Sequence, residues 1–186
     1  MIRADSSSGC TRTFTEEQPT VNLQDLRVLL DYHYWARDRI LDAVELLAPE
    51  QLTRDMSNSF RSIRDTLVHT YAAEWAWYAR WTGESPTTLL APDTFSDLAS
   101  IRNQWKEHET RMRALLDGLG EEGIDRRIDY KLLNGQPSTS VFWHMLQHVV
   151  NHATYHRGQV TTMLRQLGAT PPKAMDLIAF YRERGG

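Results

Sequence analysis

The sequence predicts an all-α protein: a four-helix bundle with a short hairpin or loop before the last long helix and a short C-terminal helix. Apolar residues recur at spacings of three and four along four long segments, which is the pattern of amphipathic helices. One short segment departs from this pattern, so strands do not alternate with the helices. In such a bundle, side chains on facing helices can build a site in the core.

The chain of 186 residues divides into a leader and one domain. Ser, Thr, Gly and Glu dominate the beginning of the chain without a helical or strand period, so we expect residues 1–21 to be a disordered or extended leader. Residues 22–186 are long enough for a single helical domain with its own core. Cys10 is the one cysteine and cannot form an intramolecular disulfide, which favours a cytoplasmic location.

The first two helices have recognisable ends. The first is expected to begin near Asn22 and to stop before Pro49, because proline cannot continue a helix. The second begins near Ser62, where the segment from Ser62 to Asp65 resembles a capping box, and it stops at Gly83.

The second half of the chain contains the remaining elements. Residues 94–120 predict the third helix, and residues 140–167 predict the fourth. Between them, residues 128–132 followed by Asn134-Gly135 suit a tight hairpin or an irregular loop. A short helical piece at about residues 175–182 follows the fourth helix.

The charge balance and hydropathy exclude two classes of partner. The chain has 21 Lys and Arg against 24 Asp and Glu, a net charge of −3, so it lacks the basic excess of a nucleic-acid-binding protein. No run approaches the roughly 18 apolar residues that a membrane span requires. We therefore expect a small-molecule substrate, with no nucleic acid and no membrane as partner.

Four of the 7 histidines, His144, His148, His152 and His156, follow one another at four-residue steps on the predicted fourth helix. Neighbours in this series lie about 40° apart on one face and about 6 Å apart along the axis, so an adjacent pair can share one metal ion. His152 and His156 lie within the apolar stripe that faces the bundle interior, whereas His148 and His144 lie toward its margin. We predict that His152 and His156 are ligands and that His148 supports a ligand or lines a cavity.

A third ligand is expected because catalytic zinc sites commonly use three protein ligands and one open position. The best candidate is His69, which shares a face of the second helix with Ala72, Ala73 and Ala76, small residues that let a neighbouring helix approach. On its own, a histidine within a helix is more often a hydrogen-bonded core residue or a solvated one than a ligand. Both interpretations of His69 stand at this point.

Other prominent side chains are given structural roles. His108 lies among charged neighbours in the sequence and is predicted to be on the surface. The tryptophans, including Trp75, Trp77 and Trp81, are predicted to fill core and interface rather than to form a stacking site.

The segment His148-Val-Val-Asn-His152-Ala-Thr-Tyr-His156-Arg-Gly-Gln159 resembles a motif on the last long helix of the DinB/YfiT-like family. Residues 32–36, 67–77 and 176–180 are similar to further motifs of that family, and the resemblance extends over residues 23–182. It implies an up-down-down-up four-helix bundle.

By position, the resemblance implies that His69, His152 and His156 bind a divalent metal, usually zinc or nickel. It also implies a homodimer. Some relatives are metal-dependent S-transferases that use a low-molecular-weight thiol such as bacillithiol or mycothiol, and others resemble metal hydrolases.

His33 and Arg37 stand where relatives often carry asparagine, four residues apart on one face of the first helix. Either they form a semi-exposed polar edge, or Arg37 offers a cation to an anionic substrate and His33 supplies an extra donor or base. Glu74 is the nearest candidate general base by family position. It lies about 140° from His69 on the helical wheel, so no catalytic role is assigned to it.

Two functions of different classes fit these residues. In the first, a metal held by three histidines activates a thiol for S-transfer or water for hydrolysis. In the second, the chain is a non-catalytic metal-binding or dimerisation module whose metal stabilises the fold.

Overall fold

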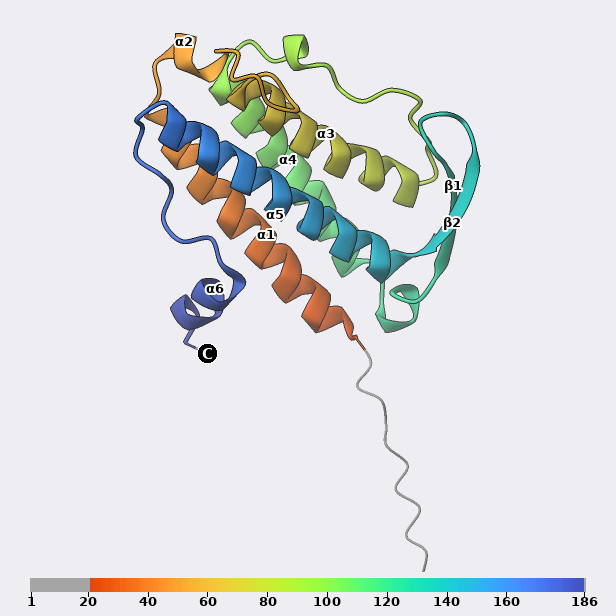
Figure 1. Cartoon of the computed structure of the whole chain (residues 1–186). Coiled ribbons are helices and arrows are strands. Elements are labelled where there is room, and N and C mark those ends of the chain that lie inside the picture. Colours follow the sequence, from red (N-terminus) through yellow and green to blue (C-terminus); the bar gives the residue numbers. More distant parts are fainter. Residues whose placement is uncertain (1–20, 186) are drawn as a thin grey trace, which may run out of the picture.

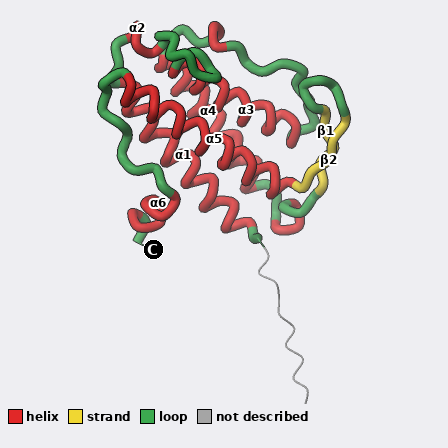
Figure 2. Tube along the Cα trace, in the orientation of Figure 1, coloured by secondary structure: helices red, strands yellow, loops and turns green. Residues whose placement is uncertain are grey.

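The computed structural model describes residues 21–185 (Figure 1). The predicted leader lies outside these residues, except for Val21. The elements in chain order are α1 (Leu23–Glu45), α2 (Pro49–Leu52), α3 (Ile63–Trp81), α4 (Leu98–Asp117), β1 (Arg127–Lys131), β2 (Pro137–Val141), α5 (Phe142–Gln166) and α6 (Leu177–Glu183). Short 3-10 turns at Pro92–Thr94 and Glu121–Gly123 flank α4. Helices predominate, and the strands are confined to one hairpin, so the predicted all-α class is confirmed (Figure 2).

The four long helices pack as a ring of neighbours. α1 packs against α4 and α5, and α3 packs against the same two helices. The ion pair Arg27–Asp117 joins the start of α1 to the end of α4, so these two helices are antiparallel. The contact of Trp81 with Phe142 joins the end of α3 to the start of α5, which are antiparallel in the same way. α1 and α5 run in one direction and α3 and α4 in the other, which gives the order up-down-down-up (Figure 1).

Polar side chains explain where three of the four long helices begin, namely α1, α3 and α4. At α1, Asn22 accepts a hydrogen bond from the Asp25 amide, and the Asp25 carboxylate accepts one from the Asn22 amide, which closes a capping box. Asp97 caps α4 in the same manner. At α3, the Ser62 hydroxyl accepts from the Asp65 amide, but the reciprocal bond between these two residues does not form. The predicted capping box at Ser62 is therefore half formed.

The segment between α4 and α5 is a hairpin rather than an irregular loop. β1 and β2 are antiparallel, with Arg127 opposite Val141 and Lys131 opposite Pro137. Gly135 in the connecting turn has a φ of +82°, a conformation that glycine adopts without strain. β2 continues directly into α5, so the hairpin is held at the start of the helix that carries the histidine series.

The apolar faces of the long helices meet in one core. Each long helix contributes side chains that are at most 1% exposed: Ile40, Val68, Ile101 and Met163. Burial of such a side chain contributes about 1.5 to 3 kcal/mol, so this core fixes how the helices face one another. Within residues 21–185, no helix is both long and apolar enough to cross a bilayer.

Candidate metal centre

His69, His152 and His156 meet where α3 packs against α5. The Nε2 atom of His152 lies 3.2 Å from that of His69 and 3.0 Å from that of His156. One ligand atom from each residue can be chosen so that all three lie within 4.8 Å of one another. Ala72 and Ala76, which are buried and lie on the His69 face of α3, allow this close approach of the two helices. The structure thus brings together the three residues predicted to be ligands, here called the three-histidine cluster.

The separations within the cluster fit one divalent cation. Nitrogen ligands about 2.1 Å from a tetrahedral ion lie about 3.4 Å from one another. The two Nε2 separations of His152 are within a few tenths of an ångström of that value. One ring nitrogen can donate a proton to one neighbour at most, so three converging imidazoles leave lone pairs facing each other. A cation removes this repulsion, and three imidazoles suit a divalent transition metal.

Gln159 determines which nitrogen of His156 faces the cluster. Its Oε1 atom lies 2.7 Å from His156 Nδ1. An amide oxygen can only accept, so Nδ1 carries the proton and Nε2 presents its lone pair. A partner on the other ring nitrogen is typical of histidines that bind metals.

The protonation state of the cluster also favours a cation. Burial lowers the pKa of His69 to about 4, with a smaller contribution from the charge of His156. Burial, followed by repulsion from the charges of His156 and His69, lowers the pKa of His152 to about 3. Burial also lowers the pKa of His156, although its hydrogen bond to Gln159 opposes this shift. The imidazoles are therefore neutral at pH 7, which is the form that binds metal.

An aromatic ring covers one side of the cluster. Phe60, in the segment before α3, stacks on the His69 ring with 3.9 Å between centroids. It also meets the His156 ring edge-on, at 5.4 Å between centroids. His69 and His152 remain partly exposed, so Phe60 does not shield the cluster completely.

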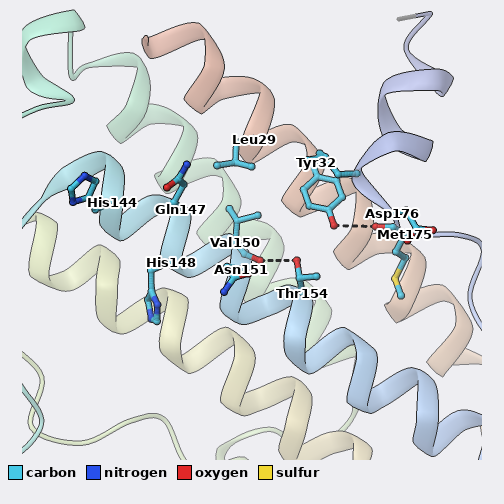
Figure 3. Close-up of a pocket in the computed structure, with 11 residues that line it drawn as sticks. Leu29, Tyr32, His144, Gln147, His148, Val150, Asn151, Thr154, Met175 and Asp176 are labelled. Carbon is cyan, nitrogen blue, oxygen red and sulfur yellow. Dashed lines mark hydrogen bonds between the residues drawn. The ribbon is translucent and has the colours of Figure 1, made fainter. Parts of the chain in front are cut away.

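His148 and His144 lie farther along α5, outside the three-histidine cluster. The His148 ring lies 5.9 Å from the His152 ring and packs edge-on against Trp77. Both His144 and His148 line two cavities, of about 390 and 670 Å³. Figure 3 shows the larger cavity, in which His148 is directed toward α3 and away from Tyr32. The structure therefore places His148 in a cavity wall.

His33 and Arg37 are buried, so the interpretation of a semi-exposed polar edge is wrong. The Arg37 guanidinium donates to the carboxylates of Asp38 and Glu109, at 2.7 Å in each case. His33 Nε2 lies 2.9 Å from Glu74 Oε2. Their side of α1 packs into the bundle, and none of these contacts involves the three-histidine cluster. The charge of Arg37 is thus neutralised inside the bundle rather than offered to a substrate.

Glu74 is the centre of a separate, fully buried polar cluster. Its carboxylate accepts hydrogen bonds from Tyr34 Oη at 2.6 Å and from Trp105 Nε1 at 2.7 Å, beside its contact with His33. Desolvation raises the pKa of Glu74, but the charge and hydrogen bond of His33 outweigh this effect and lower the pKa to about 2. Its partners come from α1 and α4, and its angle of about 140° from His69 on the helical wheel agrees with a position away from that residue. Glu74 is therefore a core residue and does not reach the metal candidates.

The surface prediction for His108 is wrong. This residue is fully buried between Tyr71 and Tyr78, with its Nε2 atom 3.8 Å from Glu74 Oε1. Each residue of a helix is turned 100° from the one before, so charged neighbours in sequence do not determine which face a side chain occupies.

Three residues near the cluster were given no role in it by the sequence: Phe60, Trp77 and Gln159. Gln159 could have been found, since it lies three residues after His156 and residues at this spacing are neighbours on a helix. Phe60 lies outside the helices, so its stacking on His69 depends on the path of the chain. Trp77 is partly exposed beside His148, and not a purely core residue.

Three comparisons with known proteins agree on one family. A family model described as DinB family matches residues 19–183. Protein DinB of Bacillus subtilis (strain 168) is 30% identical over 162 residues, which cover 82% of this chain and 92% of that protein. The crystal structure of a DinB-like protein from Bacillus cereus ATCC 10987 has the same fold, with a TM-score of 0.60 and 18% identity. That match covers 78% of this chain and 95% of the Bacillus cereus chain. Because the family model and the Bacillus subtilis relative both extend over most of its length, the chain belongs to the DinB family.

Proposed function

We propose that this protein is a metal-dependent enzyme whose divalent metal, zinc or nickel, is held by His69, His152 and His156. The observation that carries the proposal is the convergence of three neutral imidazoles from two helices, at separations that fit one ion. A bound divalent metal lowers the pKa of a thiol or water molecule at its open position and so supplies a nucleophile near pH 7.

The chain's own residues leave room for such a ligand. The group that could hold an ion has three members within residues 21–185, one fewer than a closed structural zinc site uses. Phe60 shields one side from water, and the partly exposed rings of His69 and His152 leave another side accessible. This combination favours an enzyme over a purely structural metal site.

The surroundings of the cluster favour a thiol over water as the nucleophile. Within residues 21–185, no carboxylate lies within 4.0 Å of a cluster imidazole. The carboxylate of Glu74 is hydrogen-bonded in the core and cannot act as a base for a metal-bound ligand. A hydrolase commonly uses a side-chain base to take the proton from water. A thiol is more acidic and needs less help to ionise. In S-transfer a sulfur–carbon bond forms, the leaving group departs from the electrophile, and the thiol proton passes to solvent.

Elemental analysis of protein purified at neutral pH tests the metal site. We expect about one zinc or nickel ion per chain, lost in His69→Ala, His152→Ala and His156→Ala. His144→Ala is the matched control, because it removes a histidine of the same helix that lies outside the cluster. Absence of metal from the wild type, even after reconstitution, would overturn the proposal.

A panel of low-molecular-weight thiols with chlorodinitrobenzene tests the reaction. Turnover that requires both the metal and a thiol supports the S-transferase. Metal-dependent cleavage of ester or amide substrates without any thiol would instead identify a hydrolase. A metal that raises the melting temperature but supports no turnover in either assay would identify a structural module.

A further inference from the structure

The cavity of about 390 Å³ beside the three-histidine cluster is rich in hydrogen-bond donors. It lies between α3, the hairpin and the first turns of α5. Its polar and aromatic walls are formed by Trp77, His144, His148, Arg127, Thr139 and Ser140. His148 links the cavity to the cluster, since its ring lies 5.9 Å from the ring of His152.

No carboxylate lines this cavity, and all of its lining residues belong to the described part of the chain. Four other cavities of the structure each have an acidic residue in the wall, for example Asp176, Asp42, Asp31 and Glu45. The chain as a whole has a net charge of −3, so the absence of acidic groups here is a local feature. A cavity with donors and no carboxylate suits an anion.

Two arginines near the cavity have no carboxylate partner in the described part of the chain. Arg127 is exposed and lines the cavity, and Arg80 is 7% exposed. Neither guanidinium has a carboxylate within 4.0 Å among residues 21–185. By contrast, Arg37, Arg39 and Arg113 each form an ion pair with a carboxylate. The Arg80 guanidinium lies 4.5 Å from the Trp77 ring centroid, and its buried Nε atom has no hydrogen-bond partner within those residues.

The position of Arg80 directs its charge at the cavity wall. Its guanidinium packs between Trp77, which lines the cavity, and Tyr130 of β1. Tyr130 Oη lies 3.2 Å from the hydroxyl of Ser140, another lining residue. Burying a cation without a counter-ion costs free energy, and an anion in the neighbouring cavity offsets that cost. The carboxylate of the hairpin, Asp129, accepts a hydrogen bond from Thr139 and pairs with neither arginine.

We propose that this cavity binds the oxyanionic end, a carboxylate or a phosphate, of a small molecule. The reactive group of the same molecule reaches the three-histidine cluster, so the inference rests on the proposed function. Arg127 is the direct partner of the oxyanion, because a guanidinium can donate two parallel hydrogen bonds to either group. Arg80 supplies a second positive charge from its position behind Trp77, and Ser140 offers a hydroxyl as a hydrogen-bond donor. His148, one helical turn from His152, lies along the path between the two ends of the ligand.

The spacing limits the size of this ligand. His148 and His152 are one helical turn apart, so the anionic and reactive groups are separated by about one to two turns, or roughly 6 to 11 Å. A chain of about five to nine bonds from the reactive atom to an oxygen of the anionic group satisfies this limit. The inference therefore selects small thiols or electrophiles that carry an acidic group over neutral ones.

Titration of the metal-free protein with inorganic phosphate and, separately, with succinate tests the cavity without its metal. Calorimetry at low ionic strength should show saturable binding of at least one probe, weakened about tenfold or more in Arg127→Met. Arg80→Met should weaken binding of the same probe. Arg165→Met is the control, because it removes an exposed arginine of α5 that lines none of the cavities described above. Stronger binding of phosphate than of succinate identifies a phosphate site, and the reverse identifies a carboxylate site.

Two results would overturn the inference. One is the absence of saturable binding of either probe to the wild type up to about 50 mM, well beyond a millimolar dissociation constant. The other is binding that Arg127→Met and Arg165→Met weaken equally. Arg127 is exposed, so its variant keeps the test decisive even if Arg80→Met fails to fold. Circular dichroism and melting temperature check the fold of every variant.

A second measurement separates this inference from the proposed function. In metal-loaded protein, 4-mercaptobutyrate should bind more tightly than 2-mercaptoethanol, and Arg127→Met should abolish the difference. If neither thiol binds the loaded protein while phosphate or succinate still binds the metal-free protein, thiol activation fails and the anion site stands. If both thiols bind equally well, the metal site stands and the anion site fails.

Discussion

The Oε1 atom of Gln159 lies 2.7 Å from the Nδ1 atom of His156, and this contact fixes the orientation and tautomer of a cluster imidazole. The two residues are three positions apart on α5, so the helix itself sets their spacing. Loss of the residue that hydrogen-bonds to the other ring nitrogen of a metal-binding histidine commonly lowers metal affinity about tenfold or more.

Replacing Gln159 with leucine should therefore weaken metal binding without destroying the cluster. Gln159→Leu keeps a similar volume and removes the acceptor, so we expect metal affinity to fall about 10- to 100-fold. Competition with a chromophoric chelator measures this change. Gln166→Leu, at the exposed end of α5, is the control and should bind metal as the wild type does. Equal affinity in both variants would show that Gln159 does not orient His156.

The stability of the metal-free protein should fall as pH decreases from about 6.5 to about 4. The folded-state pKa values of His69 and His152, about 4 and about 3, lie below the ordinary value of 6.5. In this window the unfolded chain takes up protons that the folded chain does not, so the free energy of unfolding decreases. Urea denaturation at pH 7.5 and pH 5 measures the effect above the range in which carboxylates titrate.

Variants of the cluster provide the comparison for this pH dependence. His69→Ala and His152→Ala each remove one group with a lowered pKa, so each should show a smaller loss of stability between the two pH values. His144→Ala, outside the cluster, should lose as much as the wild type. An undiminished loss in the two cluster variants would contradict the neutral, buried state of these imidazoles.

The buried carboxylate of Glu74 should be important for folding and not for metal binding. Glu74→Gln turns one acceptor oxygen into a donor facing Tyr34, Trp105 or His33, and we expect a loss of about 2 to 4 kcal/mol in the free energy of unfolding. Urea denaturation measures the loss. Glu84→Gln, on the exposed segment after α3, should change stability by about 0.5 kcal/mol or less. Loss of metal stoichiometry in folded Glu74→Gln would place this residue in the metal centre after all.

Glu109 should stabilise the fold by neutralising Arg37 inside the bundle. Desolvation raises the pKa of Glu109, but hydrogen bonds from Lys106, Arg37 and Arg113 outweigh it and lower the pKa to about 2. Glu109→Ala leaves a buried guanidinium with Asp38 as its remaining carboxylate, and we expect a loss of about 3 kcal/mol. This contribution is present above about pH 4.5 and disappears as pH falls toward about 2, because protonation removes the charge.

Glu107 provides a matched control for Glu109 on the same helix. Its side chain is 72% exposed and makes one long ion pair, at 3.8 Å, with Arg111. Glu107→Ala should therefore change the free energy of unfolding by no more than about 0.5 kcal/mol. Equal losses of the free energy of unfolding in Glu109→Ala and Glu107→Ala at pH 7 would show that the buried Arg37–Glu109 pair stabilises the fold no more than an exposed pair does.

The local pattern of the sequence was sufficient for the helices and for the candidate ligands. Asn22 and Ser62 mark the starts of two long helices, as predicted, because capping is a short-range interaction within one turn. The third long helix begins at Leu98, after the cap Asp97, and not at residue 94. The pairing of His152 with His156 follows from helical geometry alone, since residues four apart share a face. The choice of His69 depended on its small neighbours on α3 and on the family resemblance.

The sequence misplaced residues whose environment depends on distant elements. His108 was expected on the surface, and His33 and Arg37 either at a polar edge or facing a substrate, yet all three are buried. Each lies on a helix face that meets another helix, and the charges that accompany them, Glu74 and Glu109, come from α3 and α4. A helical wheel shows which residues share a face, but not which face meets a neighbour that carries a compensating charge.

The sequence by itself determined the helical class and the histidine pair on α5, because both arise from periodicity over a few residues. It placed the ends of the long helices to within a few residues, and its spaced motifs carried the family resemblance. The tertiary structure decided that His69 reaches that pair, that Phe60 covers it, and that Arg80 and Arg127 flank a cavity without a carboxylate. These relationships join residues far apart in the chain, so they depend on which helix faces pack together and on where the hairpin lies against them.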